Sequence, residues 1–327
     1  MAELTTQYMG LTLSNPIIVA SCSLTKSVDG VRACADAGAG AVVLKSLFEE
    51  QIKADVKELE RNIWIAGHPE AVDYVRNIGL TLGPRQYLNL IEQAKQKVSI
   101  PIIASINCVS PGHWVDYAQS IANAGADALE LNISVMPVEP ERSSEEIERM
   151  HFRILEDVKK RIALPVAVKL GPYFTSMARI AAELSRRGAA ALVLFNRFYQ
   201  PDINIDKMHL VAGYRFSSPE EMNVSLRWIA LLTGRVACDF AASTGVHDGT
   251  GVIKQLLAGA NAVQVCSALY VNGVPYIETI LAQVNEWMEQ HAFVSLDEVR
   301  GKLSQSASDR PELYERVQYI KALVGIE

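Results

Sequence analysis

The sequence predicts an α/β fold of the (β/α)8 class, a TIM barrel, built as one domain over residues 1–327. Two kinds of short apolar segment alternate along the chain, and together they make eight predicted strands. Helical patterns fill most of the intervals between them. Eight strands that alternate with helices are typical of a closed parallel barrel. An open doubly wound sheet is the alternative, but no GxGxxG motif follows the first strand and the alternation ends at eight.

The first kind of strand follows a glycine. The four segments are AGAGAVVLK (37–45), AGADALELN (124–132), RGAAALVLFN (187–196) and AGANAVQVCS (258–267). Glycine after a helical stretch is the usual left-handed stop, and the apolar run behind it fits a strand buried on both faces. Each segment is therefore predicted to be a helix end that leads into a strand.

The second kind of strand lies between the members of the first. Its segments are NPIIVAS (15–21), IPIIASIN (100–107), LPVAVKL (164–170) and RVACDFAAS (235–243). Proline stands near the start of the first three, where its missing N–H is not needed by the sheet.

Apolar residues with helical spacing predict helices over 115–125 and 251–260, another near 86–97, and an amphipathic outer helix over 272–290. The tail to Glu327 is predicted to be a further helical extension. The connections at 47–85 and 197–234 are too long and too polar to be simple helices. Loops of this length in a compact domain are usually functional or disordered.

Composition excludes several classes of partner. The net charge is −6 and no long run of Lys and Arg occurs, so we expect no nucleic-acid partner. No apolar run reaches the roughly 18 residues that span a membrane, and the N-terminus lacks the pattern of a signal peptide. The five cysteines are scattered, which indicates reduced thiols in a cytoplasmic protein. The histidines form no paired motif, so no metal site is expected.

Active sites of such barrels lie at the C-terminal ends of the strands. The residues at these ends are Ala20, Ser21, Lys45, Ser46, Asn107, Cys108, Asn132, Ser134, Lys169, Asn196, Arg197, Thr244, Gly245, Cys266 and Ser267. Lysine and asparagine are costly to bury without a partner, so several of them at one rim indicate a polar ligand. The lysines suit an electron-rich or anionic group, and the asparagines suit amide edges. A lysine that reaches solvent, or an asparagine that caps a loop, is the alternative for each.

The last two strand ends resemble a phosphate site. STGVHDG (243–249) and CSAL (266–269) offer turns in which Thr244, Gly245, Cys266 and Ser267 would hold a phosphate through backbone N–H groups. His247 is interpreted as a residue at a helix start rather than a catalyst.

The chain resembles the class 1 dihydroorotate dehydrogenases and the related flavin domain of dihydropyrimidine dehydrogenase. The motifs that carry the resemblance are NPIIVAS, LKS (44–46), NIGL (77–80), ELNIS (130–134), VKLGPYF (168–174), STG followed by VQVCSAL, and FVSLDEVRGKL (293–303). Individually they are weak, but in this order and spacing they are specific.

The resemblance implies FMN at the strand ends and a planar pyrimidine-like substrate above it. The flavin ring and ribityl chain would contact Ala20, Ser21, Lys45, Ser46, Asn132 and Lys169, and the phosphate would contact Thr244, Gly245, Cys266 and Ser267. The substrate would contact Asn77, Asn132 and Asn196, with Lys45, Asn107 and Arg197 as further candidates from the strand ends. A homodimer is also implied. Any electron-transfer partner would be a separate subunit, because the chain has no iron–sulfur cysteine cluster of its own.

The chain departs from the family pattern on the substrate side. The family motif Asn-Leu-Ser-Cys-Pro-Asn, whose Cys is the catalytic base, is here Asn132-Ile133-Ser134-Val135-Met136-Pro137. Valine cannot accept a proton. Arg197 replaces a small polar residue, and 212–214 lack the family's diglycine turn. The proton acceptor is therefore unassigned, with Ser134 and Cys108 as weak candidates and Glu139 and Tyr199 as others from the loops.

The leading hypothesis is an FMN-dependent oxidoreductase that acts on CH–CH bonds. Its substrate is dihydroorotate, as in pyrimidine biosynthesis, or a different unsaturated compound. The alternatives are a flavin-binding regulatory module without dihydroorotate turnover, and a phosphate-binding barrel lyase or isomerase without flavin.

Overall fold

The computed structural model describes residues 2–50, 85–108, 111–136, 138–197, 201–211 and 215–315. Eight parallel strands form its barrel: β3 (Ile17–Val19), β4 (Ala41–Val43), β6 (Ile102–Asn107), β7 (Ala128–Asn132), β8 (Val166–Leu170), β9 (Ala191–Leu194), β12 (Asp239–Ser243) and β13 (Ala262–Val265). The sheet closes because β13 pairs with β3 and β4 pairs with β6. Each strand falls within a predicted segment, so the (β/α)8 prediction is confirmed.

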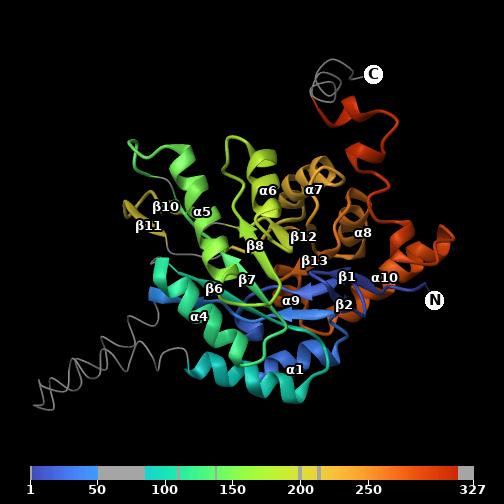
Figure 1. Ribbon diagram of the computed structural model, residues 1–327. Coiled ribbons are helices and arrows are strands. Elements are labelled where there is room, and N and C mark those ends of the chain that lie inside the picture. The colour runs from blue at the N-terminus through green and yellow to red at the C-terminus, as the bar shows by residue number, and fades with distance from the viewer. Residues whose placement is uncertain are drawn as a thin grey trace, which may run out of the picture.

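Helices surround the barrel (Figure 1). They are α1 (Val28–Asp36), α4 (Pro111–Asn123), α5 (Ser144–Lys159), α6 (Met177–Arg186), α7 (Met222–Leu232), α8 (Gly249–Ala258), the short α9 (Ser267–Asn272) and α10 (Tyr276–Gln290), and residues 85–97 are also helical. The predicted glycine stops are present, since Gly38, Gly125, Gly188 and Gly259 all have positive φ angles. These glycines let each helix end directly before the next strand.

The N-terminus forms a hairpin that the sequence analysis did not predict. Strands β1 (Thr6–Tyr8) and β2 (Leu11–Leu13) pair antiparallel. The Tyr8, Met9 and Leu13 side chains belong to one buried cluster with inward residues of all eight barrel strands. The Met9 amide donates to Asp239 at the start of β12, at 2.7 Å, which places the hairpin at the N-terminal end of the barrel. The hairpin therefore plugs the end of the barrel away from the strand exits.

The described parts of the two long connections contain small strands, and the second connection, expected to be a loop over 197–234, also contains η2 (Pro219–Glu221) and α7. β5 (Leu47–Phe48) pairs with the end of β6. β10 (Asp202–Asn204) and β11 (His209–Val211) form a separate two-stranded hairpin. Four large apolar residues of this hairpin, Ile203, Ile205, Met208 and Leu210, are 61–88% exposed. Ile203 and Leu210 are paired across the two strands and so share one face, and Ile205 and Met208 lie in the turn that joins the strands.

The chain beyond α10 differs from the expected helical extension. Residues 291–315 form three short 3-10 helices, η3 (Leu296–Glu298), η4 (Gln305–Ala307) and η5 (Pro311–Tyr314). Glycine, serine and proline interrupt this segment, and these residues favour turns over a continuous helix. Residues 316–327 lie outside the described residues.

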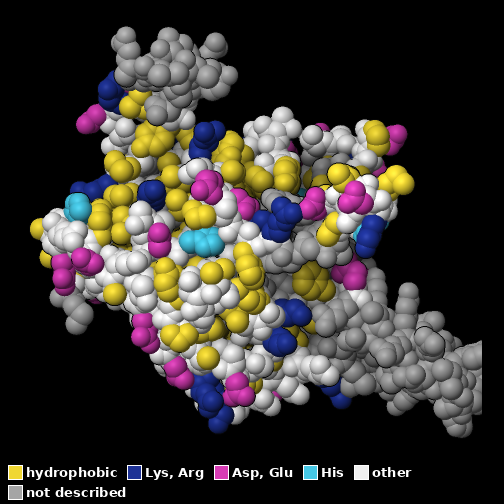
Figure 2. Space-filling view, turned by 180° about the vertical axis from the view of Figure 1, so that it is seen from behind, with side chains coloured by type: hydrophobic (Ala, Val, Ile, Leu, Met, Phe, Trp, Pro, Cys, Tyr) yellow, Lys and Arg dark blue, Asp and Glu magenta, His cyan; other side chains and the backbone are white. Residues whose placement is uncertain are grey.

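The surface mixes charges of both signs. Figure 2 shows Lys and Arg side chains interspersed with Asp and Glu among apolar groups over one face. Within the described ranges, no helix combines the length and the apolar character that crossing a membrane requires. The same residues hold no cluster of three or more His, Cys, Asp and Glu side chains suited to a metal ion.

Candidate active site

The inward face of the barrel changes from apolar to polar along the strands. Ala128, Ala167 and Ala262 belong to the buried cluster around the N-terminal hairpin. Because side chains alternate along a strand, residues two positions further on share the same inward face. In β7, β8 and β13 these residues are Glu130, Lys169 and Gln264. A layer of polar groups therefore lies above the apolar floor of the barrel, toward the strand exits.

Three polar side chains of this layer form a buried network. The Lys169 ammonium donates to Gln264 Oε1 at 2.8 Å, and Gln264 Nε2 donates to Glu130 Oε2 at 2.6 Å. Lys169 Nζ also forms an ion pair with Glu130 Oε1 at 3.6 Å. Glu130 and Gln264 are almost completely buried, and Lys169 is 7% exposed. The network fixes the lysine, as burial of a charge requires a charged or hydrogen-bonded partner.

Two predicted asparagines meet at the next level of the rim. Asn196 Nδ2 donates to Asn132 Oδ1 at 2.8 Å, although the two are 64 residues apart in the chain. Asn132 lies opposite Lys169 in the register of β7 and β8. This bond leaves the Asn196 carbonyl and the Asn132 amino group to recognise a ligand with both a donor and an acceptor.

A chain of hydroxyl groups joins the exits of β3, β4 and β6. The Ser21 and Ser46 hydroxyls are 3.0 Å apart, and the Ser46 and Ser105 hydroxyls are 2.8 Å apart. The Ser46 amide also donates to Ser21 Oγ at 2.8 Å. Two predicted residues, Ser21 and Ser46, are thus held together by a serine in the middle of β6 that sequence reasoning did not select.

The exits of β12 and β13 form a tight polar turn. Thr244 and Gly245 both have left-handed φ angles, +76° and +77°. A Cβ on Gly245 would lie 2.3 Å from the Met222 amide nitrogen, so only glycine fits there. The Gly245 amide approaches the Ser217 hydroxyl at 3.4 Å, and that hydroxyl lies 3.0 Å from Ser267 Oγ. A strained threonine of this kind is typical of ligand sites.

These groups line one polar cavity at the strand exits. Its lining residues are Ala20, Ser21, Lys169, Asn196, Arg197, Ser217, Ser243, Thr244, Gly245, Val246, Gln264, Cys266 and Ser267. The lining contains seven of the ten residues predicted to bind a cofactor. Of the other three, Ser46 and Asn132 are bonded to lining residues, and Lys45 is half-buried just beyond β4.

Cys22 and Cys266 meet at the edge of this cavity. Their thiols are hydrogen-bonded to each other, and this bond is the main reason why the Cys22 pKa is lowered to about 7. The same bond raises the pKa of Cys266. None of the five cysteines, all of which lie in the described ranges, forms a disulfide. A thiolate is therefore readily formed at Cys22, beside the cavity.

Arg197 is already bound by a carboxylate. Its guanidinium donates to Glu221 Oε2 at 2.7 Å and Oε1 at 3.3 Å, and to the Arg215 carbonyl at 2.6 Å. Burial disfavours the Glu221 carboxylate, yet its bonds from Arg197 and the Ser218 amide, together with the Arg197 charge, outweigh burial and the Glu221 pKa is lowered. The expected anion clamp is therefore an ion pair whose charge is largely compensated.

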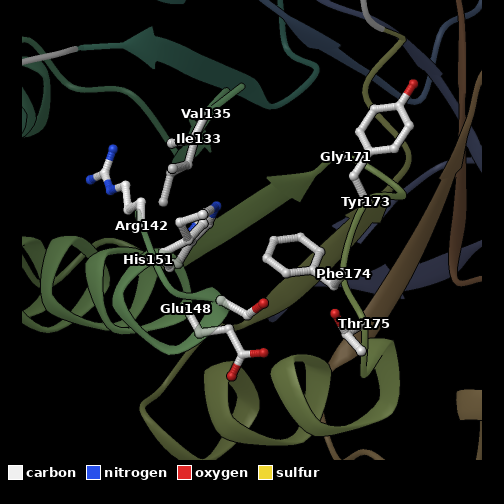
Figure 3. Close-up of a pocket in the computed structure, with 11 residues that line it drawn as sticks. Ile133, Val135, Arg142, Glu148, His151, Gly171, Tyr173, Phe174 and Thr175 are labelled. Carbon is white, nitrogen blue, oxygen red and sulfur yellow. The ribbon is translucent and has the colours of Figure 1, made fainter. Parts of the chain in front are cut away.

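A second cavity, of about 130 Å³, lies beside the barrel between the β7 and β8 exit segments and α5 (Figure 3). Val135 lines it together with Ile133, and Phe174 and His151 face it from the other elements. His151 is buried, which lowers its pKa, and it contacts Phe174 edge to face. Val135 therefore lies beside a cavity of mixed character, whose lining includes the charged residues Arg142 and Glu148.

The other candidates for the proton acceptor differ in their surroundings. Ser134 is exposed, and Glu139 is exposed and ion-paired with Arg142 at 3.5 Å. Cys108 is buried in the core, beside Tyr117, whose pKa is raised to about 12 mainly by burial and to a smaller extent by the Cys108 charge. His247 lies directly before Asp248, which caps α8, and its Nε2 is 3.3 Å from the Ser217 hydroxyl.

The remaining predicted residues are Asn107, at the end of β6, and the loop candidates Asn77 and Tyr199. Asn107 ends β6, is half-buried and pairs with Phe48. It does not line the polar cavity described above. Asn77 and Tyr199 lie outside the described residues, so their predicted roles stay predictions.

Sequence reasoning missed Glu130 and Gln264. It considered the last residue of each strand, and these two lie two positions before the exits. A signal was present, since each interrupts an otherwise apolar run, in ALELN and in AVQV. An inward polar residue in an apolar strand requires a partner, and here the two are partners of each other.

Comparison with known proteins agrees with this geometry. The family model for dihydroorotate dehydrogenase matches residues 3–288. The catalytic subunit of dihydroorotate dehydrogenase B (NAD(+)) from Thermoplasma acidophilum is 27% identical over 312 residues, covering 92% of this chain and 99% of that protein. The corresponding protein of Methanocella arvoryzae is 28% identical over 303 residues, covering 89% of this chain and 95% of that protein. Chloroplastic dihydropyrimidine dehydrogenase (NADP(+)) from Arabidopsis thaliana is 22% identical over 342 residues, covering 96% of this chain and 80% of that protein. Because the match extends over nearly the whole barrel and its polar rim, this chain belongs to the dihydroorotate dehydrogenase family.

Proposed function

We propose that the protein is an FMN-dependent oxidoreductase that acts on a CH–CH bond of a small planar substrate. The observation that carries the proposal is the polar cavity at the strand exits. It combines a buried cation, Lys169, with the close backbone turn at Gly245 and with the Ser217 and Ser267 hydroxyls. This donor set fits a flavin with its phosphate, because it offers a cation for an electron-rich ring and N–H and hydroxyl donors for an anion.

In this proposal, residues on the two sides of the cavity bind different parts of FMN. Lys169 would face the flavin ring, and Thr244, Gly245, Cys266 and Ser267 would hold the phosphate. When bound, FMN supplies two-electron chemistry at a carbon–carbon bond. The chain itself supplies binding, orientation and charge.

The substrate side favours a changed substrate. Asn132 and Asn196 are bonded to each other and suit the amide edges of a pyrimidine-like ring. Val135 replaces the base, and the Arg197 charge is taken up by Glu221. General base catalysis contributes about 10²- to 10⁴-fold, so dihydroorotate oxidation should be slow unless another group takes the proton. We therefore propose a substrate related to dihydroorotate and different from it.

Anaerobic stopped-flow spectroscopy tests both parts of the proposal. The purified protein should be yellow, with a flavin spectrum that one of a panel of dihydropyrimidines bleaches faster than dihydroorotate does. A colourless protein that takes up no added FMN rejects the flavin assignment. Fast bleaching by dihydroorotate rejects only the proposal of a changed substrate. The expected role would then be dihydroorotate oxidation in pyrimidine biosynthesis.

A flavin-binding regulatory module without turnover is the second candidate. The replacement of the base by Val135 favours it. The same experiment distinguishes it, because bound FMN would then keep its spectrum with every dihydropyrimidine and be reduced only by dithionite.

We further propose that the protein acts in the cytoplasm as a homodimer with a separate electron-transfer partner. The homodimer is supported by the hairpin β10–β11 and its turn, in which Ile203, Ile205, Met208 and Leu210 are all exposed. A lone two-stranded hairpin is marginally stable, so we expect a partner to cover these apolar side chains. At the tip of the hairpin, Asp206 is followed by Lys207. Across a twofold axis, Asp206 of one copy would face Lys207 of the other, and the opposite charges would attract each other.

Light scattering after gel filtration tests the homodimer. The wild type should elute as a dimer, and Ile205→Glu should elute as a monomer because it buries a charge in the contact. Ile205→Val is the matched control and should stay dimeric. If the wild type were a monomer at micromolar concentration, the proposal that a second copy covers the hairpin would be rejected.

A further inference from the structure

We infer that Glu130, a residue below the rim, is a positioning residue that sets the effective charge of Lys169 and so holds down the reduction potential of the flavin. This inference rests on the proposed function, since it concerns the flavin bound in the same cavity. Glu130 lines none of the cavities described above and would act through Lys169 alone.

The contacts of Glu130 couple it to Lys169 by two routes. The direct ion pair joins Glu130 Oε1 and Lys169 Nζ at 3.6 Å. The indirect route runs through Gln264, with bonds of 2.6 Å and 2.8 Å. Gln264 lies on β13, 134 residues from Glu130 in the chain, so the three side chains meet only in the closed barrel.

The two oxygens of Glu130 are in unequal surroundings. Oε2 accepts the Gln264 bond, whereas Oε1 has no hydrogen-bond partner among the described residues and only the longer ion pair to Lys169. Tyr8, from the hairpin that plugs the barrel, is also buried, and its hydroxyl is without a hydrogen-bond partner among those same residues. Burial, reinforced by the charge of Glu130, raises the pKa of Tyr8, so the phenol stays neutral. Glu130 is therefore a buried carboxylate whose charge is balanced by Lys169 rather than by solvent.

The direction of the effect follows from charge. A flavin ring gains negative charge on two-electron reduction, so a nearby cation favours the reduced form. A carboxylate 3.6 Å from that cation offsets part of this benefit, and in a buried site the offset is strong because little water screens it. Removing the carboxylate while keeping its shape should therefore make the flavin easier to reduce.

The test measures the reduction potential of the bound FMN by equilibration with a reference dye. At a fixed dye potential, Glu130→Gln should raise the ratio of reduced to oxidised flavin at least tenfold, which is about 30 mV for a two-electron couple. Glu130→Asp keeps the carboxylate but withdraws it from Lys169 by the length of one methylene group, so it should raise that ratio by a smaller factor. Glu148→Gln is the matched control, because Glu148 is a buried, ion-paired glutamate on α5, outside the barrel, and its partner is Arg179 at 4.0 Å.

The outcomes are distinguishable. A raised ratio in Glu130→Gln and a smaller rise in Glu130→Asp, with no shift in Glu148→Gln, support the inference. A ratio within threefold of the wild type in Glu130→Gln overturns it while leaving the flavin assignment intact. If Glu130→Gln does not fold, Glu130→Asp decides alone, because it keeps the buried charge, and an unchanged ratio there overturns the inference. A wild type that binds no FMN overturns the proposed function and the inference with it.

Discussion

The two sides of the active-site rim are built differently. On the proposed flavin side, short strands end in buried groups that bond to one another, as in the Lys169–Gln264–Glu130 network, and a backbone turn at Gly245 leaves no room for a side chain. On the proposed substrate side, Ser134 and Met136 are exposed, and Arg197 pairs with a residue of its own long connection. The first side is constrained by packing, so substitution there is costly. The second side is less constrained by packing, and it is the side on which we propose that this chain departs from its family's motif.

The largest effect is expected at the Gly245 turn. Gly245→Ala places a Cβ 2.3 Å from the Met222 amide nitrogen, against backbone that cannot yield easily. We expect a loss of about 3 kcal/mol in the free energy of unfolding and loss of FMN on gel filtration. Gly125→Ala is the control, because Gly125 also has positive φ but meets nothing within 4 Å. It should cost about 1 kcal/mol and keep FMN. Equal costs in urea unfolding would show that the turn is not specially constrained.

The reactivity of the Cys22 thiol tests the proposed flavin side of the rim without a mutation. The Cys22 pKa of about 7 follows from its bond to Cys266, whereas burial raises the pKa of Cys34 to about 12. The thiolate reacts and the thiol does not, so alkylation of Cys22 by iodoacetamide should rise as the pH passes through 7 and then level off. At pH 7 it should exceed alkylation of Cys34 more than tenfold, and added FMN should slow it. Mass spectrometry of the modified peptides measures both, and a midpoint near pH 9 would contradict the proposed thiol pair.

A smaller effect is expected where Arg197 meets Glu221. Glu221→Gln removes one charge of a half-buried ion pair and should cost about 1 kcal/mol in the free energy of unfolding, without loss of FMN. The lowered Glu221 pKa fixes the sign of the pH dependence. The pair stabilises the wild type above the ordinary glutamate pKa and loses this contribution as the pH falls through the lowered value. Urea titrations at pH 7 and pH 3 should therefore show a smaller difference between variant and wild type at the lower pH, and a constant difference would contradict the pairing.

The smallest effect is expected at Val135, the position that we propose to correspond to the family's base. Val135→Cys would introduce a thiol there, but the proposed differences in the surrounding turn and at Arg197 would remain. We expect less than a threefold gain in the rate at which dihydroorotate bleaches the flavin. Val135→Ser, which adds a hydroxyl in place of a thiol, is the companion variant. A gain in the range of about 10²-fold or more for Val135→Cys alone would mean that only the base had been lost and that the substrate side is otherwise intact.

The amino-acid sequence by itself determined the order and class of the elements. Glycine stops such as Gly125 and apolar runs such as ALELN act over a few residues, so they are readable without a structure. The convergence of Lys169, Asn132 and Asn196 at one rim was also predictable, because parallel strands that close into a barrel bring their C-terminal ends together.

Only the tertiary structure decided which of these groups are bonded and to what. Glu130 and Gln264 meet across 134 residues, and Arg197 selects Glu221 from a connection whose path the sequence does not specify. The N-terminal hairpin enters the barrel because inward alanines such as Ala128 and Ala262 leave space for Tyr8. Such contacts depend on distances between remote segments, and a local sequence pattern contains no information about those distances.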